Sequence, residues 1–350
     1  MTKHEESECV MKAVIVDKPF EIRVAEVPKP EIKNPDEVLI RVKYGSICGS
    51  DMGIYKGTNS LATYPRLIGH EYGGVVEAVG EGVKTLQPGD VVAVDPVRSC
   101  GHCYACRVGR HNVCSTVEVT GVHRDGGFAE YVVAPESAAY RIDTSKVPEA
   151  VISLVEPYSI GVEVAHRGRI AAGDKVLVMG SGPIGITVMQ VAKARGAEVM
   201  MTDLFDSRLD RAKKMGADIV LNVKEKDLEK EVMAWTGGEG MPVIVDSVCT
   251  PASFEQAVSL TSPAGRVVTL GLVNKPSAIA SVDLVKKELD LVGSRLNNYR
   301  FPEVIEGFEN GSLTPEGIIS SKYPCTEVDK AIQQLMEHPA DECKIVLTFD

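Results

Sequence analysis

The chain lacks any long hydrophobic run. Nothing in its 350 residues approaches the roughly 18 consecutive apolar residues of a membrane-spanning helix. The first nine residues read MTKHEESEC, which is polar and acidic and contains no apolar core of a secretory signal. The sequence therefore predicts neither a membrane span nor a cleaved leader, and the expected location is the cytoplasm.

Basic residues are in deficit. The chain has 38 Lys and Arg against 49 Asp and Glu, which gives a formal net charge of −11. Binding to the phosphate backbone of a nucleic acid needs a basic surface, so this class of partner is not expected. A small molecule remains as the expected partner.

Cysteine is also too scarce for a disulfide scaffold of this length, with nine residues in the chain. Four of them nevertheless fall within fifteen residues, at Cys100, Cys103, Cys106 and Cys114. In a reducing compartment such a cluster indicates metal ligation. Four thiolates close a tetrahedral shell around zinc and leave no open position, so we expect a structural zinc.

Two other interpretations of this cluster are less favoured. Iron–sulfur clusters also use four cysteines, but the bacterial ferredoxin run ends in Cys-Pro, and here Ser115 follows Cys114. Four unrelated buried thiols at this density would be unusual.

The distribution of strands and helices predicts an α/β protein of two domains. Up to about residue 157 the chain contains short β-branched runs separated by glycine turns, such as residues 38–44, 73–79 and 91–94. From residue 175 strands alternate with helices, which is typical of a doubly wound parallel sheet. The last 50 residues are marginal for a core of their own and are expected to return to the first domain. The predicted division is 1–157 with 300–350, including a zinc lobe near 98–115, and 158–299.

A glycine-rich turn predicts a dinucleotide site in the second domain. Gly180, Gly182 and Gly185 follow the strand at 175–179 and open a helix, with Pro183 in its first turn. Asp203 ends the next strand, where a carboxylate accepts hydrogen bonds from a ribose 2′-hydroxyl and repels a 2′-phosphate. NAD is therefore expected rather than NADP. Two further residues belong to the candidate cofactor set, Ile184 and Arg208, although Arg208 also fits a solvated helix face.

Three short motifs of the first domain could form a catalytic zinc site. A catalytic zinc takes about three protein ligands and keeps one exchangeable position. Cys48 and His70 would supply two ligands, and the carboxylate of Glu71 or Glu156 would supply the third. Asp51 could hold the imidazole of His70 from behind.

These motifs, in this order, resemble the zinc-dependent medium-chain alcohol and polyol dehydrogenases. The resemblance rests on GHEYGG at 69–74, the four-cysteine lobe, DGGFAEY at 125–131 and the glycine loop, and it covers nearly all of the chain. It implies a GroES-like β-rich catalytic domain, a Rossmann domain, one catalytic and one structural zinc, and a homodimer or homotetramer. Glu156 resembles the sorbitol dehydrogenase branch, where alcohol dehydrogenases carry a cysteine.

The resemblance also assigns the proton path. Ser50 matches the hydroxyl that takes the substrate proton. Gly53 stands where many relatives carry the next histidine of the relay, so the route beyond Ser50 differs in this chain.

The substrate is expected to carry a carboxylate. Arg295 matches the arginine that polyol dehydrogenases use against substrate hydroxyls, and Asn297 and Asn298 follow it. Arg98 and the His123–Arg124 pair match stretches that border the pocket in relatives. Segments at 95–97, 121–123 and 294–297 resemble bacterial hexonate dehydrogenases of the starvation-sensing group.

The expected activity is oxidation of a secondary alcohol of a sugar acid such as L-gulonate, L-idonate or L-galactonate at C5. A neutral polyol or L-threonine dehydrogenase is the alternative. A non-catalytic binding protein of the same fold is less expected, because the candidate metal ligands are retained.

Overall fold

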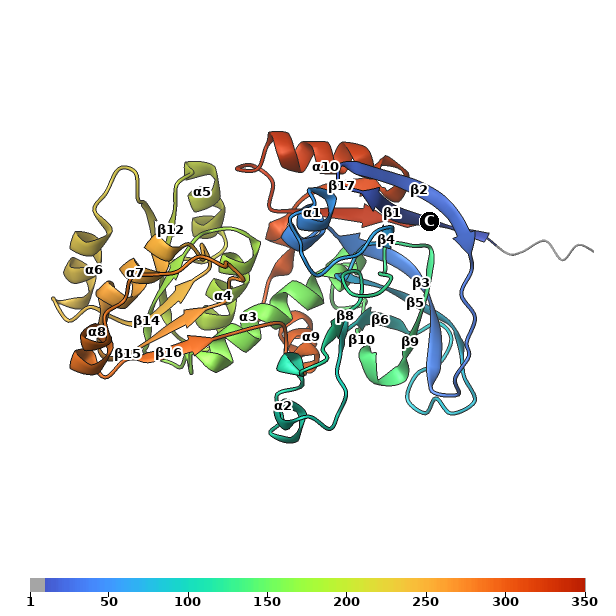
Figure 1. The fold of residues 1–350 in the computed structure, drawn as a ribbon, viewed down its shortest axis with the longest axis horizontal. Coiled ribbons are helices and arrows are strands. Elements are labelled where there is room, and N and C mark those ends of the chain that lie inside the picture. The colour runs from blue at the N-terminus through green and yellow to red at the C-terminus, as the bar shows by residue number, and fades with distance from the viewer. Residues whose placement is uncertain (1–9, 350) are drawn as a thin grey trace, which may run out of the picture. The chain divides into compact units, whose positions relative to one another are not determined.

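The chain forms two units, and one of them is inserted in sequence into the other. The computed structural model describes residues 10–349, in which residues 157–318 form one unit and residues 10–156 with 319–349 form the other. We call the first the parallel-sheet unit and the second the β-rich unit. In Figure 1 the parallel-sheet unit runs from green to orange, and the β-rich unit contains the blue, teal and red segments.

A seven-stranded sheet and a three-stranded sheet form most of the β-rich unit. The larger sheet has the order β10-β6-β5-β3-β18-β17, with β9 also paired to β3, and the smaller has the order β2-β1-β4. In β3, Ile40 and Val42 are buried while Arg41 and Lys43 are partly exposed, the period of two expected of a strand. The strands are β1 Val10–Lys18, β2 Glu21–Pro28, β3 Glu37–Ser46, β4 Arg66–Leu67, β5 Tyr72–Val79, β6 Val91–Val94, β9 Tyr131–Pro135, β10 Ala139–Arg141, β17 Ile319–Pro324 and β18 Lys344–Thr348.

Shorter elements of the β-rich unit carry the cysteines. Helix α1 (Gly49–Tyr55) follows Cys48, and the strands β7 (Val97–Arg98) and β8 (Glu118–Val119) pair at the base of the lobe that holds α2 (Tyr104–Arg107) and the turn His111–Val113. Helix α10 (Val328–Glu337) packs against β2, β17 and β18.

The parallel-sheet unit contains six parallel strands in the order β13-β12-β11-β14-β15-β16. The strands are β11 Lys175–Met179, β12 Glu198–Asp203, β13 Ile219–Asn222, β14 Met241–Asp246, β15 Thr261–Thr269 and β16 Asp290–Gly293. Val176, Leu177 and Val178 are fully buried, as in a sheet covered on both faces. The strand order reverses direction between β11 and β14, which is where sheets of this kind bind ligands. The order is that of the expected Rossmann fold.

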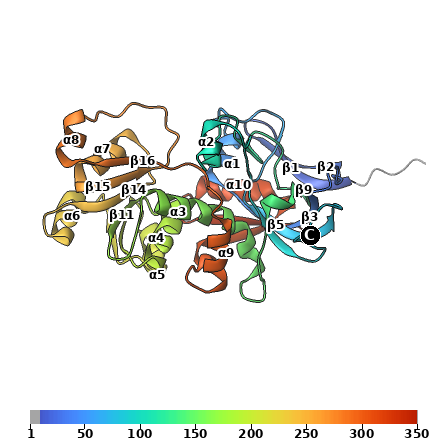
Figure 2. The same cartoon turned by 90° about the horizontal axis from the view of Figure 1, so that it is seen from below.

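Helices cover this sheet, as Figure 2 shows from below. They are α3 Val155–Arg167, α4 Pro183–Ala194, α5 Asp206–Lys214, α6 Leu228–Thr236, α7 Pro251–Leu260, α8 Ser281–Lys287 and α9 Phe301–Glu309. Among residues 10–349, no helix combines the length and the apolarity that crossing a membrane requires.

The second boundary between the units differs from the expected one. The segment 300–318 was expected in the first domain, but it belongs to the parallel-sheet unit. The Phe308 ring meets the Tyr158 ring edge-on at 4.9 Å between centroids, and Arg300 Nε donates to Glu163 Oε2 at 2.8 Å. Both contacts join α9 to α3, and the chain returns to the β-rich unit only at β17.

Candidate active site

Cys48, His70 and Glu71 come together in the β-rich unit. Each offers one ligand atom, and these atoms lie within 4.8 Å of one another. Cys48 ends the loop between β3 and α1, and His70 and Glu71 directly precede β5, which pairs with β3. Neighbouring strands of one sheet therefore bring the three side chains to one place.

Asp51 and Gly69 hold this arrangement. The fully buried Asp51 carboxylate accepts hydrogen bonds from Cys48 N at 2.9 Å and Gly69 N at 3.3 Å, and its Oδ1 lies 3.5 Å from His70 Nδ1. Gly69 has a φ of +99°, and a Cβ there would lie 2.2 Å from the Phe128 ring. Only glycine allows the chain to pass this ring before presenting His70.

The charges around His70 favour the protonated form of its imidazole. Burial lowers the pKa of His70, but the Asp51 carboxylate and Cys48 outweigh it and raise the pKa well above its usual value. Ser50 Oγ lies 3.1 Å from His70 Nε2, which places a hydroxyl beside the cluster.

Lys344 is the residue of this site that sequence reasoning missed. Its ammonium contacts both oxygens of the fully buried Glu71 carboxylate, at 2.5 Å, and Ser46 Oγ also donates to Glu71. Burial lowers the pKa of Lys344, but the charge of Glu71 raises it above its usual range. Lys344 begins β18, which pairs with β3 far along the chain, and no local sequence signal points to that contact.

Glu156 is buried near the cluster but is not grouped with the three ligand atoms. Burial, followed by the charge of Glu71, raises its pKa to about 8, while His70 and Lys344 lower it. The Glu71 carboxylate is thus grouped with the Cys48 and His70 ligand atoms, whereas the Glu156 carboxylate is not. The two carboxylates are still close enough for the charge of Glu71 to act on Glu156.

The residues of this cluster fit a catalytic zinc. A thiol, an imidazole and a carboxylate are the donor types that such sites use, and buried charges of both signs already surround them. Cys48 and His70 would hold the ion, with Glu71 or Glu156 as the third ligand.

The four cysteines of the lobe also converge. The sulfur atoms of Cys100, Cys103, Cys106 and Cys114 lie within 4.8 Å of one another. Backbone N–H groups of Cys106 and Ser115 lower the pKa of Cys103 to about 5, and those of Cys100 and Thr116 lower that of Cys114 to about 7. Burial, followed by the hydrogen bond from Cys103, raises the pKa of Cys106 to about 11. A shell of four sulfurs with N–H donors around it fits a structural zinc.

A cavity of about 700 Å³ in the parallel-sheet unit contains every residue of the candidate cofactor set. It lies at the carboxyl ends of β11 and β12. A Cβ at Gly185 would lie 2.0 Å from the Gly180 carbonyl oxygen, so this helix–strand contact needs glycine. A Cβ at Gly182 would meet nothing within 4 Å, and this residue caps α4 without a side-chain hydrogen bond. The helix start is therefore open to a phosphate. The set comprises Gly180, Gly182, Pro183, Ile184, Gly185, Asp203 and Arg208.

Asp203 has contacts that the sequence does not predict. Its Oδ1 accepts from Leu204 N at 2.7 Å and its Oδ2 accepts from Ser181 N at 2.9 Å, so it also shapes the loops around the cavity. Arg208 Nη1 lies 3.6 Å from Asp203 Oδ2. The guanidinium is thus directed toward the carboxylate and is not only part of a solvated helix face.

The candidate substrate residues are divided between the two units. Arg295, Asn297 and Asn298 lie between β16 and α9 in the parallel-sheet unit. Asn297 is fully buried, and its Oδ1 accepts from Arg300 N at 3.5 Å, so it organises this loop. The buried Ser294 hydroxyl has no hydrogen-bond partner among the residues described.

Arg98, His123 and Arg124 belong to the β-rich unit. Arg98 and Arg124 line a cavity whose described lining contains neither Cys48, His70 nor Glu71. His123 Nδ1 accepts a hydrogen bond from Val119 N at 3.0 Å, which fixes its ring within a turn. These three residues are therefore not grouped with the candidate zinc ligands.

Two family models match the chain. Residues 34–144 match the alcohol dehydrogenase GroES-like domain, and residues 183–310 match the zinc-binding dehydrogenase model. The starvation-sensing protein RspB of Escherichia coli is 41% identical, over 97% of this chain and 99% of RspB. L-threonine 3-dehydrogenase of Pyrococcus horikoshii is 40% identical over 89% and 91% of the two chains. L-galactonate-5-dehydrogenase of E. coli is 30% identical over 97% and 99%.

Solved structures agree. An alcohol dehydrogenase (rspB) of E. coli, complexed with NADH, has a TM-score of 0.91 and 40% identity, over 97% of this chain and 99% of that one. L-idonate 5-dehydrogenase of E. coli has a TM-score of 0.89 and 26% identity, over 97% and 98%. The expected family, fold class and cofactors are thus confirmed: the chain belongs to the zinc-binding medium-chain alcohol dehydrogenases and is an NAD-dependent oxidoreductase.

Proposed function

We propose that the protein oxidises a secondary alcohol of a sugar acid to the keto acid, as an L-gulonate, L-idonate or L-galactonate 5-dehydrogenase. The observation that carries the proposal is the position of Arg295 on the loop after β16. It follows Ser294 in the sequence, and the buried hydroxyl of Ser294 has no hydrogen-bond partner among the described residues. A guanidinium binds a carboxylate through two parallel hydrogen bonds. Similarity to L-galactonate-5-dehydrogenase and to L-idonate 5-dehydrogenase supports it.

In this proposal Cys48, His70 and a carboxylate hold the catalytic zinc. The bound zinc and NAD supply alcohol polarisation and hydride acceptance. Asp51 keeps the imidazole oriented through its 3.5 Å approach to Nδ1. Ser50 Oγ, which lies 3.1 Å from His70 Nε2, would relay the proton of the substrate hydroxyl by accepting it while releasing its own proton to water. The glycine loop and Asp203 orient the cofactor through its pyrophosphate and ribose.

A second candidate is L-threonine 3-dehydrogenase or a neutral polyol dehydrogenase. The 40% identity to a threonine dehydrogenase over 89% of this chain favours testing it. L-threonine also carries a carboxylate, whereas sorbitol does not, so substrate kinetics separate the three cases.

Steady-state kinetics with L-gulonate, L-idonate, L-galactonate, L-threonine and sorbitol test the proposal. We expect the highest kcat/KM for a hexonate. Arg295→Leu should lower kcat/KM for that hexonate about tenfold to a hundredfold and affect sorbitol far less, because a charge-assisted hydrogen bond contributes roughly 1.5–3 kcal/mol. Arg295→Lys should recover only part, because an ammonium lacks the planar fork. A preference of the wild type for sorbitol or L-threonine would contradict the proposal.

We also propose a homo-oligomer assembled through the β16 edge of the parallel sheet. Leu272, Val282 and Val285 are 76%, 61% and 79% exposed, and Leu291 on β16 is 38% exposed. Leu272 precedes α8, Val282 and Val285 are on α8, and exposed apolar side chains on the edge strand and on the helix before it indicate an interaction surface.

A further inference from the structure

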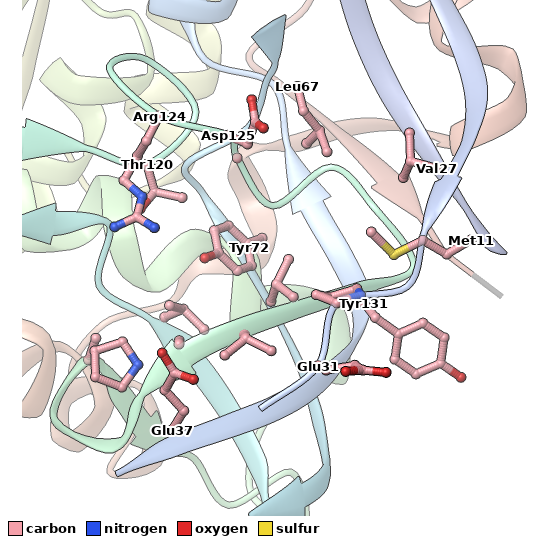
Figure 3. A pocket seen from close by; sticks show the side chains of 18 of the residues that line it. Met11, Val27, Glu31, Glu37, Leu67, Tyr72, Thr120, Arg124, Asp125 and Tyr131 are labelled. Atoms are coloured by element: carbon pink, nitrogen blue, oxygen red, sulfur yellow. The ribbon is translucent and has the colours of Figure 1, made fainter. Parts of the chain in front are cut away.

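The β-rich unit contains a second cavity, of about 570 Å³, which the reaction proposed above does not use. Figure 3 shows Met11, Val27 and Leu67 on one side of it. On the other side the Arg124 guanidinium and the Tyr72 hydroxyl lie near each other. The cavity is therefore apolar at one end and polar at the other.

Two arginines meet at the polar end. Arg98 and Arg124 both line the cavity, and both are partly buried. Two positively charged guanidinium groups that line one cavity repel each other. Such a pair is unfavourable unless an anion lies between or beside the two groups.

Within residues 10–349, neither arginine has a side-chain hydrogen bond or an ion pair that would neutralise it. Glu118 stands opposite Arg98 in the β7–β8 register but is exposed and makes no ion pair with it there. Glu37 also lines the cavity, yet its carboxylate already accepts from Lys33 N, Asn34 N and Asn34 Nδ2 at 2.7–3.0 Å.

Other polar groups at this end have partners of their own. The buried Asp95 carboxylate, which also lines the cavity, accepts from Val97 N at 3.0 Å. The Asp125 carboxylate pairs with Arg66 at 3.0 Å. The Tyr72 side chain is 3% exposed, and its hydroxyl accepts or donates no hydrogen bond among the described residues. Because this hydroxyl is not among the fully enclosed polar atoms, it opens to the cavity and can donate to a ligand there.

The loop that carries Arg124 is well fixed. Gly121 N donates to the Arg124 carbonyl oxygen at 2.8 Å, and Thr120 forms a parallel bridge with Arg124. Gly126 N donates to the Leu67 carbonyl oxygen. A preformed loop loses little conformational entropy when a ligand binds.

We infer that Arg98, Arg124 and the Tyr72 hydroxyl form a binding site for a small oxyanion, a carboxylate or phosphate group, distinct from the zinc ligand cluster. Two guanidinium groups provide planar donors for the oxygens, and the phenol supplies a third donor. The apolar wall of Met11, Val27 and Leu67 would contact the carbon skeleton of the ligand.

Isothermal titration calorimetry of the zinc-loaded protein tests this site, with inorganic phosphate in one series and succinate in another. Saturating NADH is present, because the start of α4 also attracts phosphate. Low ionic strength avoids screening. We expect one site for at least one of the two anions, and comparing the series tells phosphate from carboxylate preference.

Variants locate the site. Arg124→Gln should weaken anion binding at least tenfold, and Arg124→Lys should weaken it less. Arg141→Gln is the matched control: Arg141 has a side chain 66% exposed and a single 3.9 Å ion pair with Asp90, and it does not line the cavity. The anion affinity of Arg141→Gln should stay within twofold of that of the wild type. If Arg124→Gln fails to fold, judged by zinc content and thermal unfolding, Tyr72→Phe replaces it and should weaken binding several-fold.

Three results would overturn the inference. They are no binding of either anion by the wild type, unchanged binding by Arg124→Gln or Tyr72→Phe, and loss of binding in Arg295→Leu with retention in Arg124→Gln. The last result would place the anion at the proposed substrate site. Since Arg295 is tested by turnover, failure here leaves the sugar-acid proposal standing, and the reverse also holds.

Discussion

At the scale of single residues, Lys344 explains how a carboxylate can be fully buried beside Cys48 and His70. The Lys344 and Glu71 side chains are 2% and 0% exposed. Because neither charge is exposed to water, each is stabilised by its contact with the other. Lys344 thus keeps Glu71 charged and in place next to the candidate metal ligands.

Replacing Lys344 with methionine should therefore destabilise the protein strongly. We expect a loss of about 3–5 kcal/mol in the free energy of unfolding, because Glu71 is left as an unpaired buried charge. Urea denaturation monitored by circular dichroism measures this. Lys344→Arg, which keeps the charge, is the control and should lose less. The double variant Lys344→Met with Glu71→Gln should recover part of the loss, and no recovery would argue against a charge effect.

Asp203 gives a second prediction at this scale. Asp203→Asn keeps one of the two acceptor oxygens, loses the other to an NH2 group, and removes the charge that repels a 2′-phosphate. The ratio of kcat/KM for NADP to that for NAD should rise about tenfold or more, since the repelling charge is gone and the Arg208 guanidinium lies nearby. Asp206→Asn, at the start of α5, serves as the control for a charge lost nearby. Equal use of NADP and NAD by the wild type would contradict the role of Asp203.

At the scale of elements, the four-cysteine lobe has little regular secondary structure. Its helix α2 has four residues, none of them buried, and its two strands have two residues each. The lobe therefore depends on the sulfur cluster for order.

Cys103→Ser should lose one of two zinc ions per chain and lower the thermal unfolding temperature. Cys48→Ser should also lose one zinc and abolish turnover, yet remain folded and bind NADH. Metal analysis by mass spectrometry with fluorescence titration of NADH distinguishes the two losses. Cys343→Ser, a buried thiol outside both clusters, should keep both ions. An active wild type with one zinc or none would refute this division.

Elements also show how far the sequence could predict the fold. The strands at 91–94 and 175–179 have the predicted bounds, because apolar runs rich in valine end there at turns. The strands β1 and β2 were not predicted, although β1 has several buried residues and β2 alternates between exposed and partly buried ones. The four-residue strand β16 was also missed.

Those residues of the candidate site that belong to short sequence motifs could be predicted. Cys48, Asp51 and His70 come from short motifs, and one sheet brings them together. Lys344 could not be predicted, because its pairing with Glu71 spans 273 residues and depends on the register of β18 with β3. Arg98 and Arg124 line a cavity whose described lining contains neither Cys48, His70 nor Glu71, and their expected role near the substrate stays a prediction.

At the scale of the whole molecule, the assembly proposed through β16 is open to measurement. Multi-angle light scattering should give a dimer or tetramer at micromolar concentration. Val285→Glu places a charge on the exposed apolar edge and should shift the population toward smaller species. Met336→Glu, on α10 and 44% exposed, is the matched control and should leave the mass unchanged. A monomeric wild type would contradict the proposal.

The insertion of one unit into the other determines the order in which the chain can fold. Residues 157–318 form a sheet from consecutive strands, so this unit can fold as soon as its own segment has been synthesised. Residues 10–156 cannot complete their folding at that stage, because strand β3 has not yet paired with β18 and Glu71 has not yet met Lys344. During synthesis the middle of the chain should therefore become protease-resistant before its beginning, and zinc should load at Cys48 last.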